Sequence, residues 1–343
     1  MYLPATDSIC STPILFVQAS TVSETDCIVR KGDWWGEDTV PLPNTPGVDI
    51  VGKIYDMKQQ TATQHGLKQY QTVLSLVRWG GNSRFVSLSP SQIVKVPDSI
   101  DPAQAACLPE TYLSAFQVLH FGQQGAIRYR ENSLRGKSIL ILGSMANNMG
   151  KAILELALHA GAANIYATAK KKHWKSLIAL GIMPLSQDPI DWIMRLEGTL
   201  DLVVASNGGL REDVTPTHFR ALRDSGHLIL SGHRLVGNDV PVGEWKQSQT
   251  PIMCARNKSL LKTMSRTHSY DVFEQWEKDL NTCKRDLVHL VQLLERGILK
   301  PNVLDRLPLT KVGKAQELLE SKRLSGFLVC EPWLKTKKRA VYL

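Results

Sequence analysis

The segment from residue 136 to residue 183 constrains the fold more than any other part of the chain. It opens with a short apolar run, Ser138 to Leu142, which is typical of a strand buried on both faces. A turn of small residues follows, and from Lys151 the apolar positions repeat with the helical period as far as Gly161, a residue suited to a left-handed cap. A second strand is predicted at Asn164 to Ala169. Together these elements form one βαβ unit, which belongs to a mostly parallel sheet.

The turn between the first strand and the helix is a candidate site for a dinucleotide pyrophosphate, because backbone N–H groups lie there at the positive end of a helix dipole. A dinucleotide fingerprint has glycines at three points of such a turn, whereas the best register here, from Ser144, keeps only the last. We expect two asparagines to hold the bend, because asparagine adopts positive φ readily, but their side chains take up room that a phosphate needs. The turn alone therefore fits nucleotide binding and a βαβ unit without nucleotide equally well. Its candidate cofactor residues are Asn147, Asn148, Met149 and Gly150.

Length and composition indicate a globular protein with two domains. A chain of 343 residues, of which 43% are hydrophobic and 21% charged, is long and apolar enough for two cores and excludes wholesale disorder. The six cysteines contain no Cys-x-x-Cys pair, which argues against a disulfide framework and a four-cysteine zinc site and fits a reduced, cytoplasmic setting. We expect neither a signal peptide nor a membrane-spanning helix, because no apolar run approaches the required length.

Much of the formal net charge of +9 lies in two places, Lys170 to Lys172 and the tail from Lys335 to Arg339. Basic patches suit an anionic ligand, nucleic acid or a membrane surface, although the tail is also typical of a solvated terminus. The lysines are not interleaved with a stacking platform and no recognition motif is present, so we expect no nucleic-acid binding. The tail has few basic residues and no lipidation signal, so we expect no stable membrane insertion.

Short strands separated by proline and glycine predict an all-β module in roughly the first hundred residues. Its strands are expected at 13–19, 48–55, 73–79 and 84–88, with a short helix within 21–32. Asp101 is expected to cap a helix that starts at Pro102, and another helix is predicted at Leu108 to Leu119. Later strands are expected at 201–206, 227–232 and 326–330, and helices at 217–223, 270–296 and 311–319.

The later strand and helix units match a doubly wound sheet, in which ligands bind at the carboxyl ends of the strands. Glycine in such places is also common turn chemistry. The candidate cofactor residues after these strands are Asn207, Gly208, Ser231 and Gly232.

Five stretches of the chain carry a resemblance to a known family. In order they are ASTVSETDCIVRKGDW, TPGVDIVGKI, AACLPETYLSAF, the strand, turn and helix from Gly136 to Gly161, and KVGKAQELLESKRLSGFLV. Their order and spacing resemble the quinone oxidoreductase and enoyl reductase branch of the medium-chain dehydrogenase/reductase superfamily over nearly the whole chain. The resemblance implies an α/β fold, with a Rossmann doubly wound parallel sheet at 121–265 and a GroES-like, partly open β-barrel catalytic domain made of 1–120 and 266–343. Since the family usually begins with a further strand, we expect about one element before Met1.

The resemblance implies an enzyme that does not use zinc. Zinc-dependent relatives have a cysteine at the position of Ser23, and a histidine and a glutamate at the positions of Val48 and Asp49. Zinc requires thiolate, imidazole or carboxylate ligands in a tetrahedral arrangement, which serine and valine do not supply. The nine histidines show no metal-ligand spacing either, so we expect no metal site.

The resemblance also favours NADPH over NADH as the cofactor. An NAD enzyme has Asp or Glu at the end of the second strand, where it holds the ribose hydroxyls, whereas this chain has Ala169 followed by basic residues. Lysines there favour a 2′-phosphate, which a carboxylate repels. The residues alone fit a water-exposed basic helix start equally well. The candidate residues are Lys170, Lys171, Lys172 and His173.

The expected chemistry is hydride transfer to a small-molecule substrate, an α,β-unsaturated carbonyl, enoyl thioester or quinone, in which negative charge develops on the carbonyl oxygen. A hydrogen-bond donor must stabilise that charge. The family often has an asparagine at Ser23 and, in one subgroup, a tyrosine at Ile28, so both usual donors have changed. Each hydroxyl that remains also fits a role as a helix cap or a packed core group. The candidates are Ser23, Tyr112 and Ser114 as catalytic residues, and Thr111 as a further hydroxyl that is also a candidate cofactor-binding residue.

Other residues near the expected cleft leave two functions open. Asp26 is expected to anchor its loop or to cap a helix, and Trp34 and Trp35 to line an apolar pocket or to fill the domain seam. Relatives often have Asp at Ala205. These departures fit an enzyme with narrowed activity, or a catalytically weak or inactive family member that acts as a binding or regulatory protein. By resemblance only, we also expect a homodimer in which two Rossmann sheets pair edge to edge.

Overall fold

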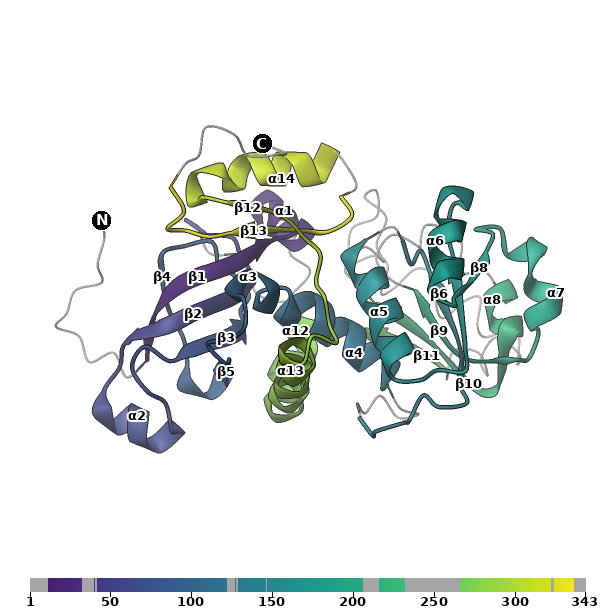
Figure 1. Cartoon of the computed structure of the whole chain (residues 1–343), viewed down its shortest axis with the longest axis horizontal. Coiled ribbons are helices and arrows are strands. Elements are labelled where there is room, and N and C mark those ends of the chain that lie inside the picture. Colours follow the sequence, from purple (N-terminus) through teal and green to yellow (C-terminus); the bar gives the residue numbers. More distant parts are fainter. Residues whose placement is uncertain are drawn as a thin grey trace.

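A computed structural model of the chain describes residues 12–32, 40, 42–121, 127, 129–145, 147–205, 216–231, 266–321 and 324–335. Two sheets lie apart along the long axis of the molecule, with several helices between them (Figure 1). Within the described ranges, no helix combines the length and the apolar character needed to cross a membrane.

Strands β6 to β11 form a parallel Rossmann sheet in the order β11-β10-β9-β6-β7-β8. This is the strand order of a doubly wound dinucleotide-binding fold, so the predicted fold class is confirmed. The last strand, β11, lies a few residues beyond the predicted boundary at 265. The strands are β6 (Ser138–Leu142), β7 (Asn164–Thr168), β8 (Met183–Leu185), β9 (Leu200–Ala205), β10 (Leu222–Ser231) and β11 (Thr267–Tyr270).

The predicted βαβ unit is present with nearly the predicted bounds. Strand β6 is buried along its whole length, as its unbroken apolar run predicted. The buried residues of the following helix include Ile153 and Leu156, which belong to the same hydrophobic cluster as Ile139 of β6. The helices of this domain are α5 (Asn148–His159), α6 (Trp174–Ala179), α7 (Ile193–Leu196) and α8 (Pro216–Ala221).

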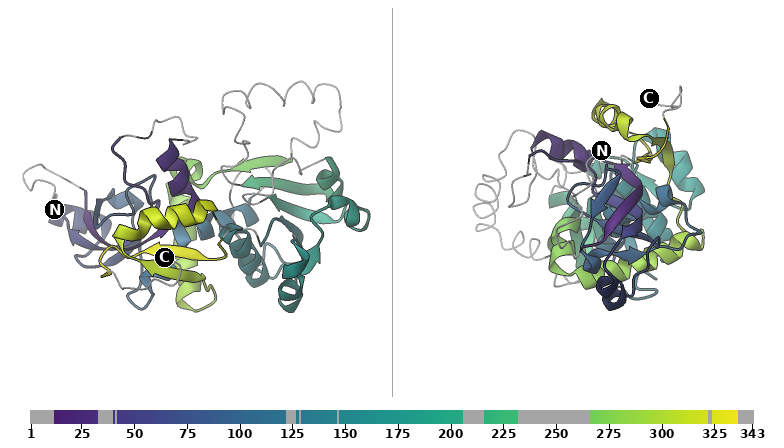
Figure 2. Two further views of the ribbon diagram at one scale, coloured as in Figure 1. Left: turned by 90° about the horizontal axis from the view of Figure 1, so that it is seen from above. Right: turned by 90° about the vertical axis from the view of Figure 1, so that its left-hand side faces the viewer.

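The second sheet joins the two ends of the chain. Its order is β12-β13-β1-β2-β3-β5, and β4 pairs with β1 rather than with β3, which precedes it in the chain. Strand β13 runs antiparallel to β1, with Thr21 opposite Val329, and Figure 2 shows the yellow C-terminal strands beside the purple β1. The strands are β1 (Ile14–Val22), β2 (Asp49–Asp56), β3 (Thr72–Leu76), β4 (Phe85–Ser87), β5 (Val94–Lys95), β12 (Val303–Leu307) and β13 (Phe327–Cys330).

Most helices of the domain that contains the second sheet follow the sequence prediction. The predicted helix at 108–119 is instead a π-helical turn at Leu108–Tyr112 followed by α4 (Leu113–Leu119), and α2 (Gln59–His65) lies in a polar stretch for which no element was predicted. Asp101 caps its helix as expected, because its side chain accepts a hydrogen bond from the N–H of Ala103 at 3.1 Å. The remaining helices are α1 (Glu24–Lys31), α3 (Pro102–Ala105), α12 (Val272–Lys278), α13 (Leu280–Glu295) and α14 (Val312–Ser321).

One hydrophobic cluster continues from one domain into the other. It extends from Leu74 of β3, through Phe116 of α4 and Leu290 of α13, to Ile153 of α5. Helix α4 contributes to this cluster between the sheets (Figure 1). Because well-packed interiors resist deformation, this shared core holds the two domains at a fixed relative position and defines the space between them.

Candidate active site

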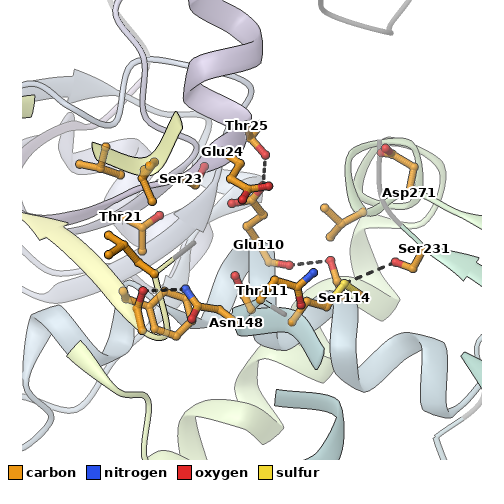
Figure 3. A pocket seen from close by; sticks show the side chains of 18 of the residues that line it. Thr21, Ser23, Glu24, Thr25, Glu110, Thr111, Ser114, Asn148, Ser231 and Asp271 are labelled. Atoms are coloured by element: carbon orange, nitrogen blue, oxygen red, sulfur yellow. Dashed lines mark hydrogen bonds between the residues drawn. The ribbon is translucent and has the colours of Figure 1, made fainter. Parts of the chain in front are cut away.

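A cavity of about 120 Å³ lies between the two domains (Figure 3). Its walls come from the junction of β1 and α1, the π-helical turn, the start of α5, the end of β10, and β13. The structure brings seven of the predicted site residues together in this cavity, which are Ser23, Thr111, Ser114, Asn147, Asn148, Met149 and Ser231.

The cofactor turn differs from the prediction in how its bend is formed. Gly143 has φ +67°, whereas Asn147 has φ −148° and Asn148 begins the helix, so the expectation that the two asparagines supply positive φ is wrong. Asn147 is instead the N-cap of α5, because its side-chain oxygen accepts a hydrogen bond from the N–H of Gly150 at 2.8 Å. Asn148 donates from its amide nitrogen to the carbonyl oxygen of Gly326 at 3.0 Å, and its own side-chain oxygen is buried without a hydrogen-bond partner.

Gly150 is required at its position by a close backbone approach. A Cβ atom there would lie 2.5 Å from the carbonyl oxygen of Ser144, a distance that real Cβ atoms do not reach. The last glycine of the turn thus allows α5 to start close against the chain that leaves β6, which is the packing role of the third glycine in a dinucleotide fingerprint. Gly150 does not line the cavity among the residues that the structure describes.

The predicted basic residues lie at a second cavity, of about 200 Å³, beyond the end of β7. Lys170, Lys172 and His173 line it, and Lys171 is not among its lining residues. No carboxylate occurs among the described residues of its wall. Burial and, after it, the charges of nearby lysines lower the pKa of His173. An anion fits this cavity better than a cation.

Together, the two cavities fit an extended dinucleotide. Leu324 lines both of them, and the N-terminus of α5 contributes residues to the first. The positive end of α5 and the lysines of the second cavity both favour an anionic ligand. The side-chain oxygen of Asn147 would compete with a diphosphate for the N–H of Gly150.

Tyr112 was predicted as a catalytic residue, but the structure does not place it in the cavity wall. Its ring is buried, and its hydroxyl donates a hydrogen bond to Glu155 Oε2 of α5 at 2.6 Å. Burial and the neighbouring carboxylate raise the pKa of Tyr112 well above its ordinary value. The phenol therefore connects the two domains and is already engaged.

Asp26 fulfils both of its expected roles. Its Oδ2 accepts a hydrogen bond from the N–H of Ser23 at 3.0 Å, which caps α1, and its Oδ1 accepts one from the N–H of Gly47 at 2.7 Å, which anchors the loop before β2. The amide of Asn82 donates to it as well, at 3.3 Å. Asp26 is fully buried, and this burial raises its pKa to about 6.

Two further carboxyl groups lie beside the cavity, and the sequence analysis assigned neither to the site. Asp49 is buried, accepts hydrogen bonds from the hydroxyl of Thr21 and from the N–H of Glu110, the latter at 2.7 Å, and has its pKa raised by burial to about 7. Glu110 lines the cavity itself and accepts a hydrogen bond from the hydroxyl of Thr25 (Figure 3). The sequence contained two separate signals, Glu110 within the stretch AACLPETYLSAF and Asp49 at the position of a zinc ligand in relatives, but did not indicate their proximity, because they come from elements far apart in the chain.

Five residues with an expected role lie outside the described ranges. They are the cofactor candidates Asn207, Gly208 and Gly232 and the pocket candidates Trp34 and Trp35. In the part of the chain that the structure describes, no three His, Cys, Asp or Glu side chains are arranged to hold a metal ion. Ser23 stands where zinc-dependent relatives have a zinc ligand. Among the described residues, its buried Oγ has no hydrogen-bond partner with good geometry. It is nevertheless close enough to the Glu110 carboxyl to lower the pKa of that group.

Comparisons with known proteins agree with this architecture. No family model matches the chain. The chain is 22% identical over 329 residues to the synaptic vesicle membrane protein VAT-1 homolog of Rattus norvegicus, which covers 93% of this chain and 76% of that protein. The structure is similar to that of the CurK enoyl reductase, with a TM-score of 0.71 and 20% identity over 96% of this chain and 94% of the other. For the quinone oxidoreductase from Coxiella burnetii the TM-score is 0.67 and the identity 20%, over 96% and 93% of the two chains. The chain therefore has the fold of the medium-chain dehydrogenase/reductase superfamily, as its sequence resemblance predicted.

Proposed function

We propose that this protein is an NADPH-dependent, zinc-independent oxidoreductase that reduces an α,β-unsaturated carbonyl, an enoyl thioester or a quinone. The observation that carries the proposal is the convergence of seven predicted site residues, six of them polar, on one cavity between the domains. The names of similar proteins, an enoyl reductase and a quinone oxidoreductase, point to the same reaction class.

The lysine cavity supports the choice of NADPH. Lys170 and Lys172 line it, and no described carboxylate does, so a 2′-phosphate would meet positive charge without repulsion. When bound, the coenzyme supplies a hydride. The protein's own residues would hold its phosphates, orient the substrate carbonyl and shield the reacting atoms from water in the cleft between the domains.

A titration of coenzyme against thermal unfolding tests this proposal. Since a ligand that binds only the native state raises its stability, millimolar NADPH should raise the unfolding temperature of the wild-type protein and NADH should do so less. The double variant Lys170→Ala/Lys172→Ala should weaken NADPH binding by roughly 30-fold or more, because each of the two charge-assisted contacts contributes about 1–3 kcal/mol, and should leave NADH binding unchanged. Lys171→Ala is the matched control, because Lys171 does not line the cavity. Equal loss in both variants would reject the phosphate assignment.

The second candidate function, a binding or regulatory protein without turnover, is favoured by one observation. The side chain of Asn147 occupies the N–H of Gly150, a donor that a diphosphate would otherwise use. If this cap excludes the coenzyme, neither NADPH nor NADH will protect the wild-type protein against heating. That outcome would favour the second function.

We also propose a homodimer, because the chain resembles a family whose members often pair two Rossmann sheets edge to edge. Among the strands that the structure describes, β11 is the outermost of its sheet, next to β10. Light scattering should give the mass of a dimer, and a monomer mass would reject the proposal.

A further inference from the structure

We propose that Glu110 is the proton donor of the cavity, which holds a proton in the resting protein and passes it to the carbonyl oxygen of the substrate during reduction. This inference rests on the proposed reductase function and names a residue for it. The family often has an asparagine at the position of Ser23 and, in one subgroup, a tyrosine at that of Ile28, so both usual hydrogen-bond donors to the carbonyl oxygen have changed and another group must serve that oxygen.

The position of Glu110 is fixed from several sides. Its backbone N–H donates to Asp49 Oδ1 at 2.7 Å, and its carbonyl oxygen accepts from Ser114 Oγ at 2.6 Å. Its side-chain Oε1 accepts from the hydroxyl of Thr25. The carboxyl lies deep among protein atoms, yet part of the residue remains exposed to the cavity, where Figure 3 shows it near Thr25 and Thr111. The group is thus held at the wall of the cavity and open to a ligand there.

The hydrogen bonds around the three carboxyl groups place the proton on Glu110. Asp26 accepts from two backbone N–H groups, and Asp49 accepts from one backbone N–H group and a hydroxyl. Donated hydrogen bonds stabilise the charged form of a carboxylate. Among the described residues, the Glu110 carboxyl accepts one hydrogen bond of full geometry, from the Thr25 hydroxyl, with the Ser23 hydroxyl nearby. No described lysine or arginine forms an ion pair with any of the three groups. Of the neighbouring pair Asp49 and Glu110, the glutamate therefore keeps the proton.

The shift in the pKa of Glu110 also supports a proton on this residue. Burial, and after it the charge of Asp49, raises the pKa of Glu110 well above its ordinary value, and Asp26 adds to the rise. The hydroxyls of Thr25 and Ser23 act in the opposite direction. The titratable groups that face Glu110 are thus Asp26 of α1 and Asp49 of β2, and two other acids, Glu24 and Asp271, line the same cavity.

The proton balance of the reaction fits this assignment. A hydride brings two electrons to the β-carbon of the substrate and forms the new C–H bond there. The π electrons of the C=C bond then shift toward the carbonyl carbon, and those of the carbonyl move to its oxygen. That oxygen takes the proton as the O–H bond of Glu110 breaks, which gives an enol and a Glu110 carboxylate. The carboxylate regains its proton from water, and the enol tautomerises to the saturated carbonyl.

The hydroxyl candidates are weaker proton donors. Ser114 Oγ already donates to a backbone carbonyl, and Thr25 donates to Glu110 itself. An alcohol is also much less acidic than a carboxylic acid, and an effective general acid has a pKa near the working pH. Ser23 and Thr111 therefore suit the orientation of the substrate, whereas the proton comes from Glu110.

The test uses Glu110→Gln in the full-length protein, because glutamine keeps the shape and a hydrogen-bond donor but has no acidic proton. The first measurement is infrared spectroscopy at neutral pH. The carbonyl stretch of a protonated carboxylic acid should be present in the wild type, and part of it should be lost in Glu110→Gln. The matched control Glu24→Gln should retain the band, because Glu24 lines the same cavity outside the three-carboxyl cluster. An unchanged band in Glu110→Gln would overturn the inference.

The second measurement is steady-state reduction of benzylideneacetone, a simple enone, by NADPH. In Glu110→Gln we expect kcat to fall by roughly 100-fold or more and the alkaline limb of the pH–rate profile to disappear, while NADPH still protects the variant against heating. A kcat within a few-fold of the wild-type value, with the limb retained, would overturn the inference alone. Absence of NADPH protection in the wild type would overturn the proposed function and this inference with it, so the two failures are distinguishable.

Discussion

At the scale of single residues, the site depends on close approaches and buried charges rather than on a recognisable fingerprint. Gly150 is the one fingerprint glycine that the turn retains, and it is the one whose missing side chain the packing requires, because Ser144 lies directly against it. The bend itself is made by Gly143. The turn therefore keeps the packing of the last fingerprint glycine, whereas Met145 and Asn147 occupy the other two glycine positions.

Replacing Gly150 by alanine should destabilise the protein. The added Cβ would lie 2.5 Å from a backbone oxygen, so α5 must move away from β6, at a cost of about 1–3 kcal/mol. Urea unfolding measures this change. Gly313→Ala in α14 is the matched control, because nothing lies within 4 Å of its position, and it should be neutral or slightly stabilising. Equal effects in the two variants would contradict the packing role.

Asp26→Asn should flatten the dependence of stability on pH. The pKa of Asp26 is raised from 3.8 to about 6, so the folded state binds a proton more tightly than the unfolded state. Asp26 therefore contributes about 3 kcal/mol to the free energy of unfolding. This contribution is fully present below pH 3.8 and is lost as the pH rises through about 6. Urea unfolding at a series of pH values should show this decline in the wild type and a smaller one in the variant. Asp49, whose pKa is about 7, should keep part of the slope.

At the scale of elements, the sequence predicted the strands, helices and helix caps that depend on neighbouring residues in the chain. The buried strand β6, the helix α5 and the capped ends at Asp101 and Gly32 follow from apolar periods and cap residues within a few positions. The pairing of β4 with β1 could not be predicted in this way, because it joins segments about seventy residues apart. The carboxyl cluster was missed for the same reason, since Asp26, Asp49 and Glu110 meet only in the folded chain.

The N-cap of α5 gives a prediction about the coenzyme. Asn147→Gly should cost only a few tenths of a kcal/mol, because glycine is itself an acceptable N-cap. It should also tighten NADPH binding, because the N–H of Gly150 then becomes available to a diphosphate. Fluorescence titration of NADPH into both proteins measures the change. Weaker binding by the variant would mean that Asn147 contacts the coenzyme directly instead of competing with it.

At the scale of the whole molecule, Glu155 joins the two domains. This residue of α5 accepts hydrogen bonds from the hydroxyl of Tyr112 at 2.6 Å and from the N–H of Lys300, in the segment that leads back to the barrel, at 2.8 Å. The hydrophobic cluster that extends between the domains surrounds the same region. The relative position of the domains, and with it the shape of the cavity, therefore depends on polar contacts as well as on packing.

Tyr112→Phe separates this architectural role from a catalytic one. The change keeps the ring against Phe327 but leaves a part-buried carboxylate oxygen without its donor, so the free energy of unfolding should fall by about 1 kcal/mol. Tyr55→Phe, in a half-exposed position, should change it by less than about 0.5 kcal/mol. Because the Tyr112 hydroxyl faces α5 and not the cavity, the pH–rate profile with NADPH should keep the wild-type shape. If Tyr112→Phe removed one limb of that profile and left the free energy of unfolding unchanged, Tyr112 would have the catalytic role that the sequence predicted.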